Sequence, residues 1–426
     1  MATTEAVAVR THVPSVVRRN TILLAIVQGI AWLTIQSLVL LGADTAFRIT
    51  NDKAWSGVPL TVFGVASALT GPNAGRLMDR FGRRPPLMAG QAVLGLGTIM
   101  AALSAFYGSL PGFLFASIVM GIGTGASVLS RSAAADMYPV ARRGEGISFI
   151  LMGGAVAAIG GPQLLFIVTN SARSVGADPL VVPWAVVFLF TVAGVVSMLL
   201  LRPDPRDIAA NLANYYPAEE PRAPAVQAPS RATPVILRQF PVIVAIAATG
   251  LVQAGMAMFM ATAPLDIKLH GHGDAVYGIL TGHFFGMLGL SLFIGRLADR
   301  LGRRLIILGG AVIFMIGAIT TPIFHNPLYI GASLFLVGLG WSLCFVSGNT
   351  VLADMARPLE RGRVLGANDM VVGLTSAAAT LLGGVLLATG GFLMVGAVSI
   401  VLVLVPLFLA VRLREAEPGH YGTAPA

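Results

Sequence analysis

Residues 75–84 read GRLMDRFGRR and residues 295–304 read GRLADRLGRR, so one ten-residue pattern occurs twice, 220 positions apart. A second matched pair lies nearby. Residues 135–144 contain Ala-Asp-Met followed by Arg-Gly, and residues 353–362 contain the same elements, 218 positions later. Two landmarks repeated at nearly one offset indicate a duplication. The sequence therefore predicts two similar halves.

The composition excludes a water-soluble protein. Of the 426 residues, 56% are apolar and 11% are charged, whereas soluble proteins carry about 25% charged residues. The mean hydropathy is +0.82, and a single cysteine, Cys344, excludes a disulfide scaffold. The net charge of +9 would suggest nucleic acid in a soluble protein. Because most arginines lie in short loops between apolar runs, we expect a lipid bilayer and no nucleic acid as partner.

The apolar runs predict an all-α membrane protein with twelve transmembrane helices in two six-helix halves. Each run approaches the roughly 20 residues that a helix needs to cross the hydrocarbon core. The expected spans lie at about 21–43, 56–75, 86–106, 110–130, 147–168, 180–201, 241–264, 276–295, 304–324, 328–352, 365–387 and 390–411.

The basic residues predict the orientation. Arg10, Arg18 and Arg19 precede the first run, which is too long for a signal peptide. If the N-terminus is cytoplasmic, all basic residues lie in cytoplasmic loops, in the tails or at Arg131, with four exceptions. The exceptions are Arg48, Lys53, Arg173 and Lys268. We expect a multi-pass protein of the cell inner (plasma) membrane with both termini cytoplasmic.

A proline-rich segment divides the chain. Residues 203–234 contain seven prolines and mixed charges, which is typical of a mobile polar linker, with a short helix expected near 207–215. The expected organisation is a first half at 1–202, a cytoplasmic linker at 203–235 and a second half at 236–426.

The two repeated loops strongly resemble the signature of the major facilitator superfamily, which that family carries between helices 2 and 3 and between helices 8 and 9. Twelve spans, the long central loop and both Arg-Gly loops extend the resemblance over the whole chain. The first copy departs at Met78, where the family usually has a small residue. The resemblance implies a secondary transporter that works by alternating access, not an enzyme.

The resemblance also implies a cytoplasmic charge network that gates the transporter. Aspartates would pair with arginines of the same half and hold the halves together while the outside is open. The alternative is that the arginines only set the topology. The expected network comprises Asp79, Arg80, Arg83, Asp136, Arg143, Asp299, Arg300, Arg303, Asp354, Arg361 and Asp369.

Polar residues within the spans are candidates for a substrate or proton cavity, because polar groups in lipid are costly. They are Gln28, Gln36, Arg131, Gln163, Gln253, His283, Trp341 and Asn349. Each glutamine is as well explained by helix–helix hydrogen bonding. His283 is expected near the midplane, and an unperturbed imidazole titrates near neutral pH, so this residue is either a proton carrier or a bond between helices. Arg131 either faces the cavity or pairs with Asp136.

The sequence leaves the substrate and the direction of transport open. Gly160-Gly161-Pro162 resembles part of the antiporter motif of drug exporters, although Leu165 and Phe166 stand where glycines are expected. We expect proton-coupled export of a small amphipathic or weakly acidic compound. The alternatives are proton-coupled uptake of an organic anion or nutrient, and lipid transport on the same fold. We expect a monomer without metal or cofactor. The sequence lacks nucleotide-binding motifs, so we expect no direct drive by ATP.

Overall fold

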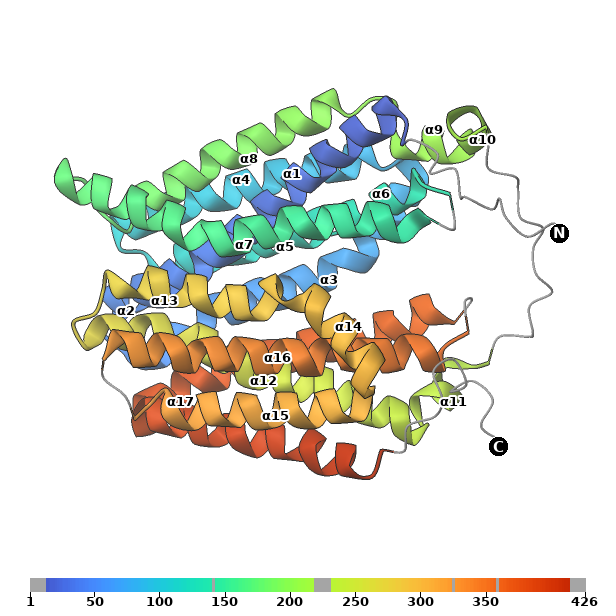
Figure 1. Cartoon of the computed structure of the whole chain (residues 1–426). Helices are drawn as coiled ribbons and strands as arrows, with labels where there is room; N and C mark the ends of the chain where they lie inside the picture. Colours follow the sequence, from blue (N-terminus) through green and yellow to red (C-terminus); the bar gives the residue numbers. More distant parts are fainter. Residues whose placement is uncertain (1–12, 140–141, 218–230, 324–325, 358–359, 414–426) are drawn as a thin grey trace.

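The computed structural model describes residues 13–139, 142–217, 231–323, 326–357 and 360–413. These residues are almost entirely helical, and none of them forms a strand. Figure 1 shows the helices of residues 15–200 on one side of the bundle and those of residues 240–411 on the other. Their lengths follow from long runs of apolar residues.

The first half contains six spans. They are formed by α1 (Ser15–Ser37) with the π-helix η1 (Leu38–Gly42) and α2 (Ala43–Thr50); the 3₁₀-helix η2 (Lys53–Gly57) with α3 (Val58–Phe81); α4 (Arg84–Tyr107); α5 (Leu110–Ser127) with α6 (Ser130–Asp136); α7 (Arg143–Ser174); and α8 (Val182–Leu200).

The second half repeats this arrangement. Its elements are α12 (Phe240–Leu269); α13 (Ala275–Phe284) with the π-helix η4 (Phe285–Gly289) and α14 (Ser291–Leu301); α15 (Arg303–Thr320); α16 (Pro327–Met355); and α17 (Arg361–Val411). Within α17, Gly391 has φ 68° and ψ −171°, so the helix is broken into two spans at this residue.

The prediction of twelve spans agrees with this architecture. Among the described residues, ten helices are long and apolar enough to cross a membrane, and the pair Ala275–Gly289 and Phe293–Leu301, bent by 47°, adds an eleventh. The break at Gly391 divides the longest helix and gives the twelfth. It lies two residues beyond the gap at 388–389 that the sequence predicted between the last two spans.

Glycines allow equivalent helices to approach closely in both halves. A Cβ atom on Gly123 of α5 would lie 2.5 Å from the backbone nitrogen of Leu94 in α4, so only glycine allows this close approach of the two helices. A Cβ atom on Gly340 would lie 2.4 Å from the nitrogen of Phe314, which joins α16 to α15. Small residues at such crossings are typical of membrane helices, where close packing replaces the hydrophobic effect.

The expectation of a mobile linker over residues 203–234 is wrong for its described parts. The predicted short helix is present as α9 (Pro205–Ala210) and α10 (Leu212–Tyr215). Ile208 and Tyr216 are buried in the same cluster as residues of α1 and α4. Apolar side chains spaced through this polar segment hold it against the first half, so it is part of the fold.

The far end of the linker packs on the second half. The short helix α11 (Thr233–Leu237) leads into α12. Just before α11, Nη2 of Arg231 lies 2.7 Å from Oε2 of Glu360, whose side chain is fully buried. The backbone nitrogens of Arg231 and Arg357 also donate to this carboxylate. Hydrogen bonds from Arg231 lower the pKa of Glu360 to about 2 although burial opposes the change, and the pKa of Arg231 is raised.

Figure 1 shows α9, α10 and α11 at the same end of the bundle. We call this the linker end. Helices α3 and α14 both end here, so the turns at Gly82 and Gly302, which follow them directly, lie at this end. The opposite end, which carries α2 and the start of α13, is called the distal end.

Candidate functional site

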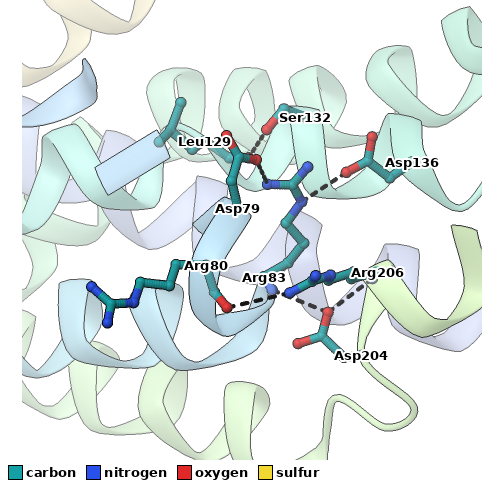
Figure 2. Close-up of polar contacts among 8 residues, drawn as sticks. All are labelled: Asp79, Arg80, Arg83, Leu129, Ser132, Asp136, Asp204 and Arg206. Atoms are coloured by element: carbon teal, nitrogen blue, oxygen red, sulfur yellow. Dashed lines mark hydrogen bonds and ion pairs between the residues drawn. The ribbon is translucent and has the colours of Figure 1, made fainter. Parts of the chain in front are cut away.

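At the linker end, the first repeated loop forms a compact charge cluster. Gly82 has φ 90°, a conformation that glycine adopts freely, and it turns the chain from α3 into α4. The turn places Nη1 of Arg83 2.7 Å from Oδ1 of Asp79, and Nε of Arg83 2.8 Å from Oδ2 of Asp136 at the end of α6. Figure 2 shows the guanidinium between the two carboxylates. Burial alone would lower the pKa of Arg83, but both carboxylates outweigh it and the pKa is raised.

The second repeated loop builds the same cluster in the second half. Gly302 has φ 89°. Nη2 of Arg303 lies 3.0 Å from Oδ1 of Asp299, and its Nε lies 3.5 Å from Oδ2 of Asp354. The duplicated sequence thus produces a duplicated ion-pair geometry.

Each cluster lies within one half. The pairs Arg83–Asp79 and Arg83–Asp136 join only α3, α4 and α6. The structure brings Arg83, and not Arg143, to the two aspartates. Next to Arg143, Nη2 of Arg142 lies 2.9 Å from Oε2 of Glu145.

The remaining predicted members of the network lie elsewhere. The guanidinium of Arg80 lies 5.2 Å from the ring centre of Phe81, and Arg300 lies in the last turn of α14. The side chain of Arg361 is outside the described residues. Asp369 lies on α17 and contacts the first half, as described below.

The final arginine of each repeated loop caps the last helix of its own half, which the sequence analysis did not predict. Nε and Nη2 of Arg84 donate to the carbonyls of Met198 and Leu199, at 2.8 and 3.0 Å. Nη2 of Arg304 donates to the carbonyl of Val411 at 2.8 Å. Helix C-termini expose unpaired carbonyls that favour cations. The Arg-Arg pair that ends both repeated loops was the feature of the sequence from which this capping role could have been predicted.

Asp204 of the linker is a further contact that the sequence analysis did not predict. Its carboxylate accepts hydrogen bonds from the backbone nitrogens of Arg83, Arg84 and Arg206, at 3.0, 2.9 and 2.8 Å. Arg206 in turn donates to the carbonyl of Arg80 (Figure 2). Asp204 therefore caps both α4 and α9. Its place before Pro205 was a recognisable cap signal.

Arg131 joins the two halves. Its Nη2 lies 3.8 Å from Oδ2 of Asp369 on α17, and both side chains are partly exposed. The pairing of Arg131 with Asp136 is wrong, because Asp136 is bonded to Arg83. Asp369 is therefore placed opposite the cavity candidate Arg131 and not in either cluster.

Other cavity candidates form a chain of contacts within the second half. Nε1 of Trp341 donates to Oε1 of Gln253 at 2.7 Å, and Nε2 of Gln253 lies 3.4 Å from Oγ of Ser376. The Trp341 ring stacks on Phe345 with centroids 4.5 Å apart. The side chain of Asn349 bonds its own helix at the carbonyl of Phe345. This group joins α12, α16 and the first part of α17.

The three glutamines of the first half join helices. Gln28 accepts a 2.9 Å hydrogen bond from Ser130, and Gln36 donates to the carbonyl of Ala158 at 2.9 Å; both are buried. Gln163 differs, because its Nε2 donates at 3.0 Å to Oγ1 of Thr281 in the second half.

His283 is fully buried within the second half. Its Nδ1 lies 2.7 Å from the carbonyl of Leu334 on α16. A Cβ atom on Gly338 would lie 2.4 Å from the His283 carbonyl, so α13 and α16 are in close contact here. Of the two roles considered for His283, this geometry favours the bond between helices.

Ion pairs at the distal end account for three of the four basic residues outside the orientation pattern. Lys268 lies 2.9 Å from Asp44 and Arg173 lies 2.8 Å from Asp274, and both pairs join the two halves. Arg48 lies 2.8 Å from Asp178 within the first half. Because these basic residues lie outside the expected cytoplasmic loops, the sequence could have indicated that they form ion pairs.

The comparisons with known proteins agree with this architecture. A family model described as Major Facilitator Superfamily matches residues 21–268 and 245–425. The chain is 28% identical to an uncharacterized MFS-type transporter, YdeG, of Bacillus subtilis, over 88% of each chain. It is also 28% identical to the riboflavin transporter RfnT of Brucella anthropi, over 94% of this chain and 97% of the relative. The crystal structure of a D-xylose-proton symporter matches with a TM-score of 0.71 at 15% identity, over 93% of this chain and 97% of that one.

Proposed function

The chain belongs to the Major Facilitator Superfamily, and from this premise we propose that it moves a small, weakly acidic or amphipathic organic compound together with protons. As a member of that family it is a multi-pass membrane protein and a secondary transporter, and it is not an enzyme. The proposal concerns the substrate class, the coupling ion, the direction and the orientation.

The contacts between the halves support alternating access from the conformation described here. Lys268 with Asp44, Arg173 with Asp274, and Tyr277 with Thr169 all join the halves toward the distal end. The charge clusters of the linker end each stay within one half. This pattern is that of a transporter closed at the distal end. We infer that the linker end and both termini face the cytoplasm, in the cell inner membrane; the concentration of arginines in the loops of that end supports this orientation.

The single observation that carries the substrate proposal is the pair Arg131–Asp369. A guanidinium and a carboxylate face each other from opposite halves at 3.8 Å, with both side chains partly exposed. A substrate anion can take the place of the Asp369 carboxylate on Arg131. Protonation of Asp369 releases Arg131 for that anion, so proton and anion bind together. This coupling favours movement of both in the same direction, which is the uptake alternative of the sequence analysis.

Export in exchange for protons is the second candidate. The segment Gly160-Gly161-Pro162 favours it, because it resembles part of an antiporter motif and lies in α7, which contacts the second half through Gln163. The name of the relative RfnT suggests a planar aromatic compound with polar edges as a first probe.

Transport by purified protein in liposomes tests the proposal. Riboflavin and a series of aromatic carboxylates are first screened for those that raise the melting temperature, because a ligand that binds only the native state does so. We expect such a compound to accumulate when the outside is made acidic. Accumulation driven by an acidic interior would favour the exporter. Movement of labelled lipid between leaflets, without movement of any of these compounds, would contradict both.

A further inference from the structure

Lys268 bridges the two halves through two acceptors. It lies in the last turn of α12, in the second half. Its Nζ is 2.9 Å from Oδ2 of Asp44 on α2 and 3.2 Å from the carbonyl oxygen of Leu40 in η1, both in the first half. One side chain thus holds a carboxylate and a backbone carbonyl that lie about one turn apart on the first span.

The local backbone of the first span makes this double contact possible. Residues Leu38–Gly42 form a π-helical turn between α1 and α2. Such single turns widen the helix and occur frequently at functional sites. Here the turn contains Leu40, whose carbonyl accepts from Lys268, and it is followed directly by the α2 turn that carries Asp44. The irregular turn therefore presents both acceptors to the same lysine.

Burial distinguishes this pair from the other ion pairs of the distal end. The side chains of Lys268 and Asp44 are 16% and 26% exposed. Those of Arg173 and Asp274, which also join the halves, are 48% and 67% exposed. Exposed ion pairs contribute little to stability because water screens them. Breaking a partly buried pair leaves an unpaired charge in an environment of low dielectric. Arg48–Asp178 has similar geometry but lies within the first half.

We propose that Lys268 holds the distal end of the transport pathway closed through its bonds to Asp44 and to the carbonyl of Leu40. The inference rests on the alternating access of the proposed function. Opening the distal end separates α12 from the first span and breaks both contacts of Lys268. The free energy of these contacts therefore sets the ratio of distal-closed to distal-open protein.

Distance measurements between spin labels test this inference in the full chain. Cys344 is the only cysteine, so a Cys344→Ala background accepts labels at chosen positions. Val175 at the C-terminal end of α7 and Leu328 in the first turn of α16 are both highly exposed. These helix ends lie at the distal end, one in each half, so cysteines there report its opening. In Lys268→Ala and Asp44→Asn, we expect the ratio of long to short distances to rise roughly tenfold.

Two matched variants control the experiment. Arg48→Ala breaks an ion pair at the same end that does not cross between the halves, and it is expected to leave the distance distribution unchanged. The double variant Asp44→Lys with Lys268→Asp is expected to restore the closed population, and it keeps the test informative if a single variant folds poorly.

The outcomes separate the two levels of the proposal. Two distance populations whose ratio is the same in wild type and Lys268→Ala would overturn the role of Lys268 alone. A single population in wild type and in every variant, with no effect of bound compound, would contradict alternating access itself.

Discussion

Arg83 and Arg303, 220 positions apart, make the same two contacts in the two halves. Each guanidinium forms an ion pair with the aspartate four residues before it and another with an aspartate at the end of the fourth span of its half. The first aspartates, Asp79 and Asp299, remain 74% and 67% exposed. Their open faces are available to the opposite half when the linker end closes. The clusters thus order each loop in the present conformation. In the conformation with a closed linker end, their aspartates provide charges for contacts with the opposite half.

Replacing the exposed aspartates tests this gating role. Asp79→Asn should change stability by less than about 1 kcal/mol, because the ion pair is exposed. We expect turnover in liposomes to fall roughly tenfold, since the closed linker end loses a charge contact. Asp299→Asn is the matched variant of the second half and should behave alike. Unchanged turnover in both would remove the clusters from the gate.

The pair Arg131–Asp369 yields a separable prediction for coupling. Asp369→Asn imitates the protonated acid, so exchange of substrate across the membrane should persist while accumulation driven by a pH gradient is lost. Arg131→Gln should weaken binding of an anionic compound about tenfold. Asn349 is the equivalent of Arg131 in the second half, and its side chain donates to the carbonyl of Phe345 in its own helix, so Asn349→Ala is the control. Gradient-driven accumulation by Asp369→Asn would contradict the coupling.

His283→Ala distinguishes a bond between helices from a proton carrier. The variant loses the hydrogen bond to the carbonyl of Leu334 and leaves a cavity where the buried imidazole packed between α13 and α16. We expect a loss of about 1–3 kcal/mol of stability, seen as a lower melting temperature, with the pH profile of transport retained. A flat pH profile would instead assign proton transfer to His283.

The pKa of Glu360 predicts how stability depends on pH. Because Arg231 lowers this pKa to about 2, the pair stabilises the fold fully above the ordinary carboxyl value and loses its contribution as the pH falls toward 2. Glu360→Gln should cost about 2 kcal/mol at pH 7. The difference in melting temperature from wild type should shrink below pH 4.5. Glu145→Gln, at a more exposed pair, should show a smaller difference; equal effects would show that burial is irrelevant here.

Asp204 is expected to stabilise the first repeated loop. Asp204→Ala removes three hydrogen bonds to backbone nitrogens, and helix caps contribute about 0.5–2 kcal/mol each. The melting temperature should fall by a few degrees. Asp207→Ala, on the exposed surface of α9, is the control. If both variants melt like wild type, the linker contributes nothing to the fold.

Much of the site could be predicted from local sequence, and its cross-half contacts could not. The repeated loops predict aspartate–arginine pairs because glycine turns and four-residue spacings fix their geometry over short distances. The choice of Arg83 over Arg143 depends on where the end of α6 lies relative to the turn between α3 and α4. The partner of Arg131 depends on where α17 of the other half lies, so proximity in sequence to Asp136 was misleading.

The sequence by itself determined the two halves, the twelve spans and the side on which the positive charges gather, because these follow from apolar run length, duplication and charge position. Only the tertiary structure decided that residues 203–216 pack, that His283 bonds α16, and that Lys268 meets Asp44 across 224 positions. Those contacts depend on the relative placement of the helices. In a membrane, close packing sets that placement, because the hydropathy of the helices does not distinguish a surface that faces lipid from one that faces another helix.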